Sequence, residues 1–241
     1  KVLASATGTI KRLDEQKRFP WLGNRIGDPE RVIPPFTALG AQGNKLSCWG
    51  RTYTLNGLAV PGQMASQGAA LLSEPMRIVV VRDGKEMLVP LKGAPEIIEV
   101  KPWKIGYRGK ASGAGLDLTV EGQLEQDGTL FYTMTYAPAG GKPVKLDALR
   151  LEYAMSKQEA QLIHCVGAGG NYAAKTTGFV PEGDGRVWST LEIGRQASGM
   201  TVGTFFPQVW VGNNTRGLIW WGANDEGWVP EGKTWPEMHG P

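Results

Sequence analysis

The fold of this chain is indicated most directly by the stretch Leu116-Asp-Leu-Thr-Val-Glu-Gly-Gln-Leu-Glu-Gln-Asp-Gly-Thr-Leu-Phe-Tyr-Thr-Met-Thr-Tyr136. Apolar and polar residues alternate on both sides of Asp127-Gly128, which is the pattern of strands that bury one face. Asp-Gly favours a type I′ turn, because both central residues of that turn need positive φ. We therefore predict a β-hairpin centred on Asp127-Gly128, with one face of both strands in a core.

The same signals recur along the chain. Three more dipeptides of the hairpin type are Asn56-Gly57, Asp83-Gly84 and Asp184-Gly185. Further strands are predicted at Met76 to Val81, Leu149 to Met155, Gln161 to Val166 and Gly203 to Val211. Helical signals are limited to a turn or two within Gly62 to Leu72 and a short corner at Ser156 to Ala160. Many closely spaced strands with almost no helix predict an all-β fold, a large antiparallel β-sandwich.

Composition narrows the function classes. The chain has 241 residues with a net charge of +3, and its Lys and Arg residues are scattered among the acidic ones, which gives no electrostatic case for nucleic acid. No apolar run approaches the ~20 residues of a membrane-spanning helix. Its 34 glycines and 16 prolines indicate many tight turns. No linker divides the chain, so we expect one domain over residues 1–241.

Metal and thiol chemistry are not supported by the spacing of the candidate ligands. Cys48 and Cys165 lie far apart, and His164 and His239 complete no zinc-type pattern. The cysteines are either a long-range disulfide or two buried free thiols. We expect no metal and no cofactor. The triplet Asn213-Asn-Thr215 fits the glycosylation acceptor pattern, which is common by chance.

The segment Arg216-Gly-Leu-Ile-Trp-Trp-Gly-Ala-Asn-Asp-Glu-Gly-Trp228 is the best candidate for a binding surface. It predicts an aromatic strand that ends at an Asn-Asp-Glu-Gly turn. Indole rings can cover the C–H face of a pyranose, while amides and carboxylates bind its hydroxyls. The candidate contacts are Trp220, Trp221, Asn224, Asp225 and Trp228. The alternative is that these rings are core, with Asp225-Glu226 forming a turn rather than a catalytic pair.

A second candidate surface lies near the N-terminus, where Trp21, Asn24 and Arg25 can line a polar groove. The alternative is that Trp21 anchors a long loop to the sandwich. Three other tryptophans fall within alternating strands and are predicted to be core. They are Trp49, Trp188 and Trp210. Trp103 cannot be assigned from the sequence.

Several segments together resemble the opening of the β-N-acetylgalactosaminidase-like bacterial glycoside hydrolases. The resemblance is spread over most of the chain and depends on no single diagnostic motif. The segments are Phe19-Pro-Trp-Leu-Gly-Asn-Arg-Ile-Gly27, Val32-Ile-Pro-Pro-Phe-Thr-Ala-Leu39, Ser47-Cys-Trp-Gly-Arg51, Ser66-Gln-Gly68, Glu74-Pro75, Val202-Gly-Thr-Phe-Phe-Pro-Gln-Val-Trp210 and Arg216 to Trp228.

The resemblance implies the N-terminal, non-catalytic β-sandwich of a glycoside hydrolase, followed in the full protein by a catalytic (β/α)₈ barrel beyond Pro241. It implies two partners, that barrel and a carbohydrate such as an amino-sugar-containing glycan. It also implies a secreted or periplasmic location. The acid pair of the family belongs to the barrel, so we assign no catalytic residue here and do not treat Asp225-Glu226 as that pair.

Two other function classes stay open. One is a stand-alone carbohydrate-binding module with a row of exposed rings. The other is a sandwich enzyme such as an epimerase or lyase, which needs acid–base groups converging on one face. With His164 and His239 as the chain's histidines, the enzyme alternative is the weaker one.

Overall fold

A computed structural model describes residues 19, 21, 30–166, 177–189, 208–223 and 237–239. These residues form antiparallel strands in several packed sheets, with one short 3₁₀ turn, η1 (Ala139–Gly141). The prediction of an all-β sandwich with few helical turns is confirmed. No helix in the described residues is long and apolar enough to cross a membrane.

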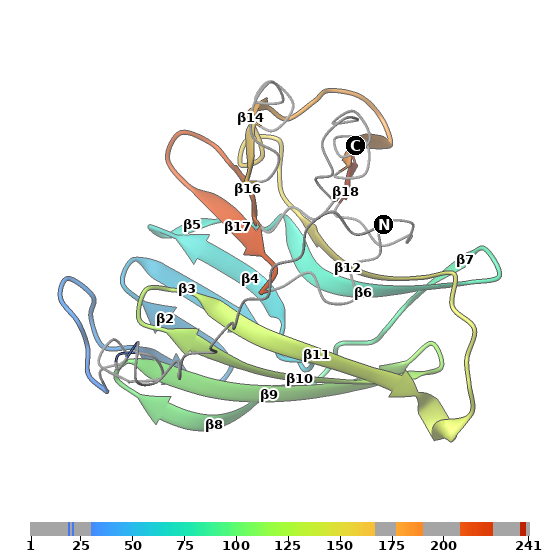
Figure 1. Cartoon of the computed structure of the whole chain (residues 1–241), viewed down its shortest axis with the longest axis horizontal. Helices are drawn as coiled ribbons and strands as arrows, with labels where there is room; N and C mark the ends of the chain where they lie inside the picture. The colour runs from blue at the N-terminus through green and yellow to red at the C-terminus, as the bar shows by residue number, and fades with distance from the viewer. Residues whose placement is uncertain are drawn as a thin grey trace, which may run out of the picture.

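The larger part of the molecule is a sandwich of two layers (Figure 1). One layer is the sheet β11-β10-β9-β8. The other contains the sheets β1-β2-β3-β4-β5 and β12-β6-β7, with β4 in contact with β6. The strands are β1 (Gly40–Gln42), β2 (Lys45–Cys48), β3 (Arg51–Leu55), β4 (Pro61–Ser66), β5 (Ala69–Ala70), β6 (Glu74–Arg82), β7 (Lys85–Leu88), β8 (Glu96–Lys101), β9 (Lys104–Gly113), β10 (Leu116–Glu125), β11 (Leu130–Pro138) and β12 (Ala148–Ala154).

A smaller part packs on the sandwich and has its own sheet, ordered β14-β13-β16-β17. Its strands are β13 (Leu162–Val166), β14 (Thr177–Phe179), β16 (Gln208–Gly212) and β17 (Gly217–Trp221). A separate pair joins β15 (Arg186–Ser189) to β18 (Glu237–His239). The predicted strand at Gly203 to Val211 is therefore present from Gln208 onward, and its first residues lie outside the described part.

The core of the sandwich follows the alternation of β10. Leu116, Leu118, Val120 and Leu124 are at most 2% exposed, whereas the polar residues between them face outward. β10 pairs with β11 in the predicted register, in which Val120 lies opposite Met134. A one-residue slip would move every apolar side chain to the solvent face, so burial of one face fixes this register.

The hairpin dipeptides have different outcomes. Asp83-Gly84 is a type I′ turn between β6 and β7, with φ of 49° and 70°. Asp127-Gly128 joins β10 to β11, but of these two residues Gly128 alone has positive φ, so the predicted type I′ geometry is wrong. The turn closes through Gly128 N donating to Glu125 O at 2.9 Å. Asp184-Gly185 joins no hairpin, because β14 and β15 pair with β13 and β18.

The Asn56-Gly57 hairpin connects β3 to β4 through a longer loop that places positive φ at Ala59. Two further type I′ turns were not predicted, Gln67-Gly68 and Ala114-Gly115, because neither dipeptide starts with Asn or Asp. Gln67-Gly68 corrects a second prediction.

The helical turn expected within Gly62 to Leu72 is instead the β4–β5 hairpin. β5 ends at Ala70, and the backbone of Leu72 just beyond it bonds to the side chain of Gln63 on β4. Gln63 Oε1 accepts from Leu72 N at 3.1 Å, and Gln63 Nε2 donates to Leu72 O at 2.9 Å. The predicted corner at Ser156 to Ala160 is a turn, in which Ala160 N donates to Ser156 O at 2.9 Å.

The cysteines belong to different cores. Cys48 lies in the sandwich core and Cys165 in the core of the smaller sheet, and both are free. Of the two alternatives from the sequence, buried free thiols are the correct one. Burial raises the pKa of the Cys48 thiol and raises the pKa of Cys165 to about 12, which keeps both thiols protonated and unreactive near neutral pH.

The close approach of β9 to the β3–β4 loop gives the first prediction. A Cβ atom on Gly109 would overlap the backbone of Leu58 and Ala59. We expect Gly109→Ala to lower the free energy of unfolding by about 1–3 kcal/mol, because the backbones must separate. Urea unfolding measures the change. Gly62→Ala is the matched control, since its Cβ would contact Thr54 O at an ordinary 3.4 Å; equal effects of the two substitutions would contradict the prediction.

Candidate functional site

Several turns of the two layers meet at one end of the sandwich, which we call the turn end. They are the turns at Trp49-Gly50, Gln67-Gly68, Pro102-Trp103 and residues 126–128. Side chains and backbone link them across the layers. Tyr53 OH donates to Gly128 O at 2.7 Å, Ile33 N donates to Gln126 Oε1 at 2.8 Å, and Leu39 N donates to Pro102 O at 2.8 Å.

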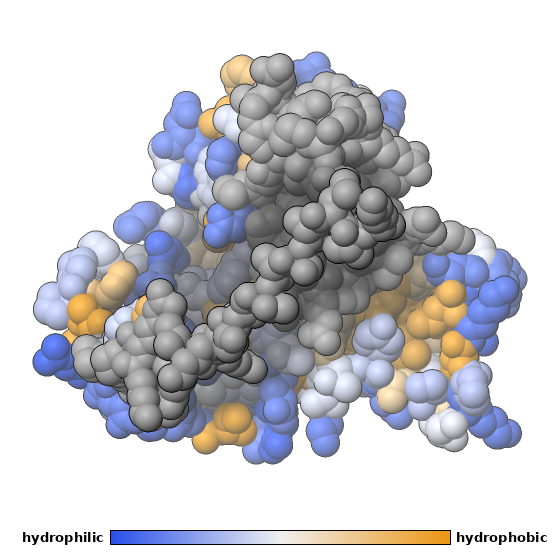
Figure 2. All heavy atoms as spheres, in the orientation of Figure 1, coloured by the Kyte–Doolittle hydropathy of each residue, from blue (hydrophilic) through white to orange (hydrophobic). Residues whose placement is uncertain are grey.

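Aromatic rings lie on the surface of the turn end. Trp49 is 54% exposed and meets the ring of Phe36 edge to face, with centroids 6.1 Å apart. The prediction that Trp49 is core is wrong, because β2 ends at Cys48 and leaves Trp49 in the turn. Trp103 is half-buried, with Lys101 Nζ 5.8 Å from its ring centroid. Figure 2 shows hydrophobic residues among hydrophilic ones at this end of the surface.

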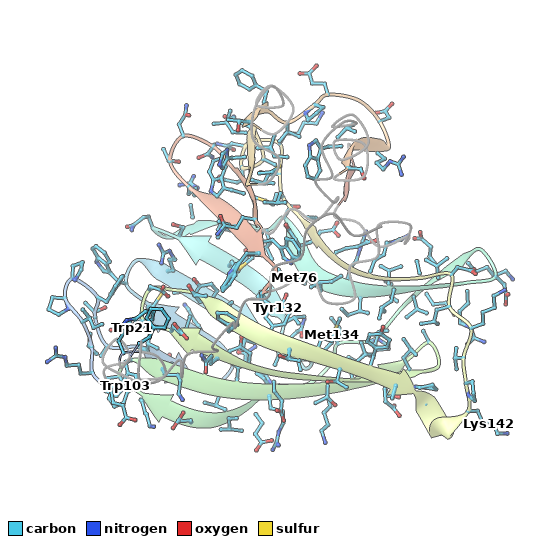
Figure 3. All side chains as sticks on the ribbon, viewed as in Figure 1. Trp21, Met76, Trp103, Tyr132, Met134 and Lys142 are labelled. Carbon is cyan, nitrogen blue, oxygen red and sulfur yellow. The ribbon has the colours of Figure 1, made fainter. Side chains whose placement is uncertain are left out.

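Trp21 is the most exposed of the predicted contact residues in the described part, at 64%. Its ring lies 5.6 Å from that of Phe19. Figure 3 places Trp21 and Trp103 at the same end of the long axis, opposite Lys142. The structure therefore brings Trp21 to the turn end. Asn24 and Arg25 lie outside the described residues.

The aromatic strand predicted at Arg216 to Trp221 is present as β17, but its two tryptophans separate. Neighbouring residues on a strand face opposite sides. Trp220 packs against the core of the smaller sheet, whereas Trp221, 38% exposed, meets Phe131 of β11 edge to face at 4.6 Å. Trp221 thus links the smaller sheet to the sandwich. Asn224, Asp225 and Trp228, together with Glu226, lie outside the described residues.

The other tryptophans predicted to be core differ in burial. Trp188 is 5% exposed and belongs to the core of the smaller part, as predicted. Trp210 is half-buried, and its indole covers Gly212 and Gly217, where a Cβ atom would overlap it. The glycines of the β16–β17 hairpin therefore make room for this ring.

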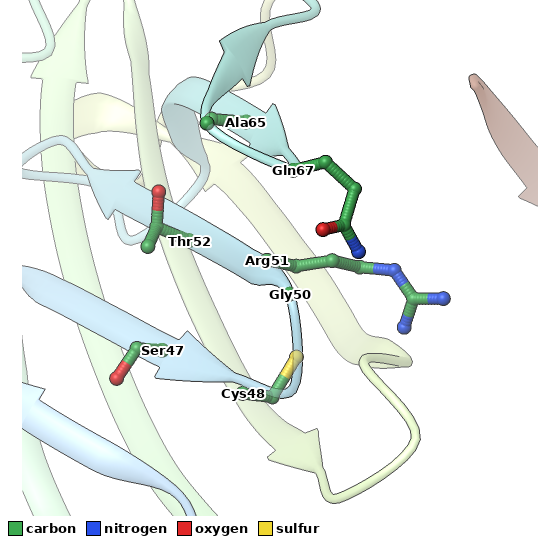
Figure 4. Close-up of a pocket in the computed structure, with 8 residues that line it drawn as sticks. Ser47, Cys48, Gly50, Arg51, Thr52, Ala65 and Gln67 are labelled. Atoms are coloured by element: carbon green, nitrogen blue, oxygen red, sulfur yellow. The ribbon is translucent and has the colours of Figure 1, made fainter. Parts of the chain in front are cut away.

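A shallow hollow of about 340 Å³ lies between the β2–β3 and β4–β5 turns (Figure 4). Arg51 and Gln67 extend side by side from its edge. The Arg51 guanidinium donates through Nη1 to the carbonyl of Asp127. The full lining is Ser47, Cys48, Gly50, Arg51, Thr52, Ala65, Gln67 and Gly68. Sequence reasoning did not identify Arg51 or Gln67, because only strand register brings their turns together.

Carboxylates of the described strands are largely held in ion pairs. Glu96 binds Arg108 at 2.8 Å, and Glu86 binds Arg150 at 2.6 Å. The pKa of Glu99 is lowered by hydrogen bonds from its neighbouring lysines. Burial raises the pKa of Glu152, but hydrogen bonds and charge from Arg77 and Arg150 outweigh it, so the pKa is lowered overall. No group of three or more His, Cys, Asp or Glu in the described part could hold a metal ion.

A buried ion pair fixes the β16–β17 hairpin. Glu159, 8% exposed, accepts from Arg216 Nε at 2.8 Å and from Arg216 Nη2 at 3.1 Å. Asn213 Nδ2 donates to the same carboxylate at 3.1 Å, and Asn213 Oδ1 accepts from Thr215 N at 2.9 Å. The amide of the Asn213-Asn-Thr215 triplet is thus engaged within the protein and serves a structural turn.

The Glu159 cluster gives the second prediction. The hydrogen bonds from Arg216 lower the pKa of Glu159 below its unfolded value. The stability that ionised Glu159 contributes to the folded protein is therefore fully present above a pH of about 4.3, the ordinary pKa of Glu. This contribution is lost as the pH falls through the lower pKa of the folded state. We expect Glu159→Gln to lower the urea midpoint at pH 7 and to flatten its fall between about pH 5 and pH 3. Tryptophan fluorescence reports the unfolding. Glu182→Gln, at an exposed position, is the control; a profile for Glu159→Gln as steep as that of the parent protein would refute the assignment.

Comparison with known families assigns the chain. Residues 39–221, from the edge of β1 to the end of β17, match the family model described as glycoside hydrolase 123, third domain. A search of curated proteins finds no match. The match confirms the resemblance to β-N-acetylgalactosaminidase-like hydrolases. It numbers this domain third, and the expected place before a barrel stays a prediction. Because more than half of the chain matches, the protein belongs to the glycoside hydrolase 123 family, of which it carries a β-sandwich domain.

Proposed function

We propose that this domain is the non-catalytic accessory domain of a glycoside hydrolase, which packs on the catalytic barrel of the same polypeptide and contacts glycan through the turn end. The observation that carries the proposal is the exposure of Trp49 and Trp21 at that end. Exposed indoles beside polar groups suit pyranose rings, which have apolar C–H faces and polar edges. Export to the periplasm or the exterior, where large glycans are met, is part of this proposal.

The state of the carboxyl groups supports a non-catalytic role. A glycosidase that works with two carboxylates needs one with a raised pKa to protonate the leaving group. The described carboxyl groups with shifted pKa values, Glu99, Glu152 and Glu159, are all shifted downward by basic partners. They are ionised at neutral pH and occupied by Lys or Arg. Such groups serve structure better than acid catalysis.

The barrel contact is best supplied by an apolar strip that joins the two parts of the molecule. It consists of Ile219 and Trp221 on β17 and Phe131 on β11, which are 53%, 38% and 39% exposed. β17 is an edge strand of its described sheet, and Ile219 and Trp221 lie on the same face of it. Contacts between domains of one chain bury ~600–1,500 Å², and exposed apolar side chains are their usual anchors.

The third prediction tests the barrel contact. We expect the gene to continue past the codon for Pro241 into a (β/α)₈ barrel, and a signal sequence to precede Lys1. In that longer protein, Ile219→Asp places a charge in the strip and should increase proteolytic cleavage between the domains by about tenfold. Phe179→Asp is the control, because Phe179 is 82% exposed on β14. Equal cleavage of the two variants would place the barrel elsewhere.

The fourth prediction tests the glycan contact with the chain itself. We expect binding to an amino-sugar oligosaccharide such as chitotetraose, measured by calorimetry, without hydrolysis. Trp49→Ala should weaken binding about fivefold, since an aromatic contact supplies ~0.5–1.5 kcal/mol beyond its buried area. Tyr136→Ala is the matched control, because Tyr136 is 56% exposed on β11 away from the turn end. If Tyr136→Ala weakens binding and Trp49→Ala does not, the glycan binds the face that carries Tyr136 and not the turn end.

A stand-alone carbohydrate-binding module is the second candidate function, and the same exposed tryptophans favour it. Both functions include the same glycan contact, and they differ in whether the gene encodes a catalytic barrel in the same polypeptide. A stop codon directly after Pro241, together with glycan binding by this chain, would make the stand-alone module the correct assignment.

A further inference from the structure

The hollow at the turn end contains two polar groups with spare hydrogen-bonding capacity. Arg51 donates through Nη1 to the carbonyl oxygen of Asp127, and its guanidinium also forms a hydrogen bond with the Cys48 thiol. A guanidinium has five N–H donors, so donors remain for a ligand. The carboxamide of Gln67 has no hydrogen-bond partner among the described residues. Both side chains are exposed and extend in the same direction (Figure 4). A ligand can therefore meet a guanidinium and an amide together.

Arg51 differs from the paired arginines of this structure. Arg77, Arg108, Arg150 and Arg216 each bind a carboxylate. Arg51 forms no ion pair with any described residue. A guanidinium is a planar donor that matches the two oxygens of a carboxylate or sulfate. Its free donors thus favour an oxyanion over a neutral hydroxyl.

The position of the Arg51 side chain is fixed without a carboxylate. Register places Arg51, the first residue of β3, opposite Cys48 on β2 and opposite Ser66 on β4. Its Nη1 is held by the carbonyl of Asp127, and Gln67 N donates to Gly50 O at 2.7 Å. The Gln67 side chain lies against Gly50, where a Cβ atom would overlap it. The Arg51 guanidinium is therefore positioned by a backbone carbonyl, and the Gln67 side chain lies close beside the same turn.

We propose that this hollow is a subsite for an acidic sugar, in which the Arg51 guanidinium and the Gln67 amide bind the oxyanion of a uronate or a sulfate ester. The exposed ring of Trp49, next to Gly50, stacks on the adjoining pyranose. The inference rests on the proposed glycan contact and adds the charge class of the sugar. The carboxylate of Asp127 in the facing turn accepts from Thr129 N at 2.8 Å, and its negative charge opposes an anionic ligand, which the Arg51 guanidinium must outweigh.

The experiment measures binding of tetragalacturonate, a sulfated carrageenan tetrasaccharide and neutral chitotetraose to the chain by calorimetry. We expect one of the two acidic probes to bind the parent protein at least about tenfold tighter than chitotetraose does. Arg51→Gln should lower the affinity for that probe about tenfold, which is the effect of losing one charge-assisted hydrogen bond. The tighter acidic probe distinguishes uronate from sulfate. Raising salt from about 0.05 to 0.5 M should weaken acidic binding severalfold and leave neutral binding unchanged.

Two variants make the assignment specific. Asp127→Asn keeps a residue that suits the turn and leaves the backbone carbonyl that binds Arg51 in place. It should raise the affinity for the acidic probe about twofold and leave the affinity for the neutral probe unchanged. Arg82→Gln removes an arginine without a described ion pair on the β6–β7 hairpin and should change nothing. Equal losses in Arg51→Gln and Arg82→Gln would overturn the subsite.

The outcomes also separate this inference from the proposed function. Binding of chitotetraose with no preference for acidic probes overturns the acidic subsite and leaves the glycan contact standing. Absence of binding to all three probes overturns both. Thermal unfolding of each variant checks its fold, and Arg51→Lys, which keeps the charge, should retain more acidic binding than Arg51→Gln.

Discussion

The sandwich is organised around a loop that is buried between its layers. Leu58, Ala59 and Val60, which connect β3 to β4, are fully buried, and β9 passes so close that Gly109 has no room for a side chain. Asn56 makes this burial possible, because its Oδ1 accepts from Leu58 N at 3.0 Å. Its Nδ2 is buried without a partner, a cost that the apolar contacts of the loop offset. Both layers therefore depend on a connection that occupies their shared core.

The turn end follows from the same arrangement. Residues 51, 53 and 55 of β3 face one side, and their burial changes along the strand from Leu55 at 1% to an exposed Arg51. Arg51 is thus the outermost residue of this row, at the start of β3, where the core ends. Its side chain reaches the facing turn at Asp127 instead of an apolar neighbour. An arginine at this step caps the open end of the sandwich and still presents donors to solvent.

Two neighbouring tryptophans on β17 face opposite sides of the strand, and one of them joins the smaller sheet to the sandwich. Trp220 completes the core of its own sheet, and Trp221 contacts Phe131 on β11. The Glu159–Arg216 pair holds the hairpin that carries both. The geometry of β17 therefore depends on a salt bridge at one end and an aromatic contact at the other, which gives a fixed base to the segment after Trp221.

The residues of the binding surface could be predicted only in part. Aromatic residues beside polar ones predict Trp21 and Trp221 as contact residues, and both side chains are exposed. Alternation that runs past Cys48 predicts a core position for Trp49, but β2 ends at Cys48 and leaves Trp49 in the turn. Arg51 and Gln67 lie in segments that resemble the family, but no sequence pattern assigns either residue to a binding site. They become neighbours because Arg51 pairs with Ser66 across β3 and β4, a relation that exists only after the strands have found their register.

The sequence alone determined the all-β class, the strands with clear alternation and the family to which the chain belongs. Alternation is a local property, and it survives in any arrangement that buries one face. The tertiary structure decided the turn types, the replacement of a predicted helical turn by the β4–β5 hairpin, and the separate cores of Cys48 and Cys165. These depend on contacts between residues far apart in sequence, whose energies the local pattern does not contain.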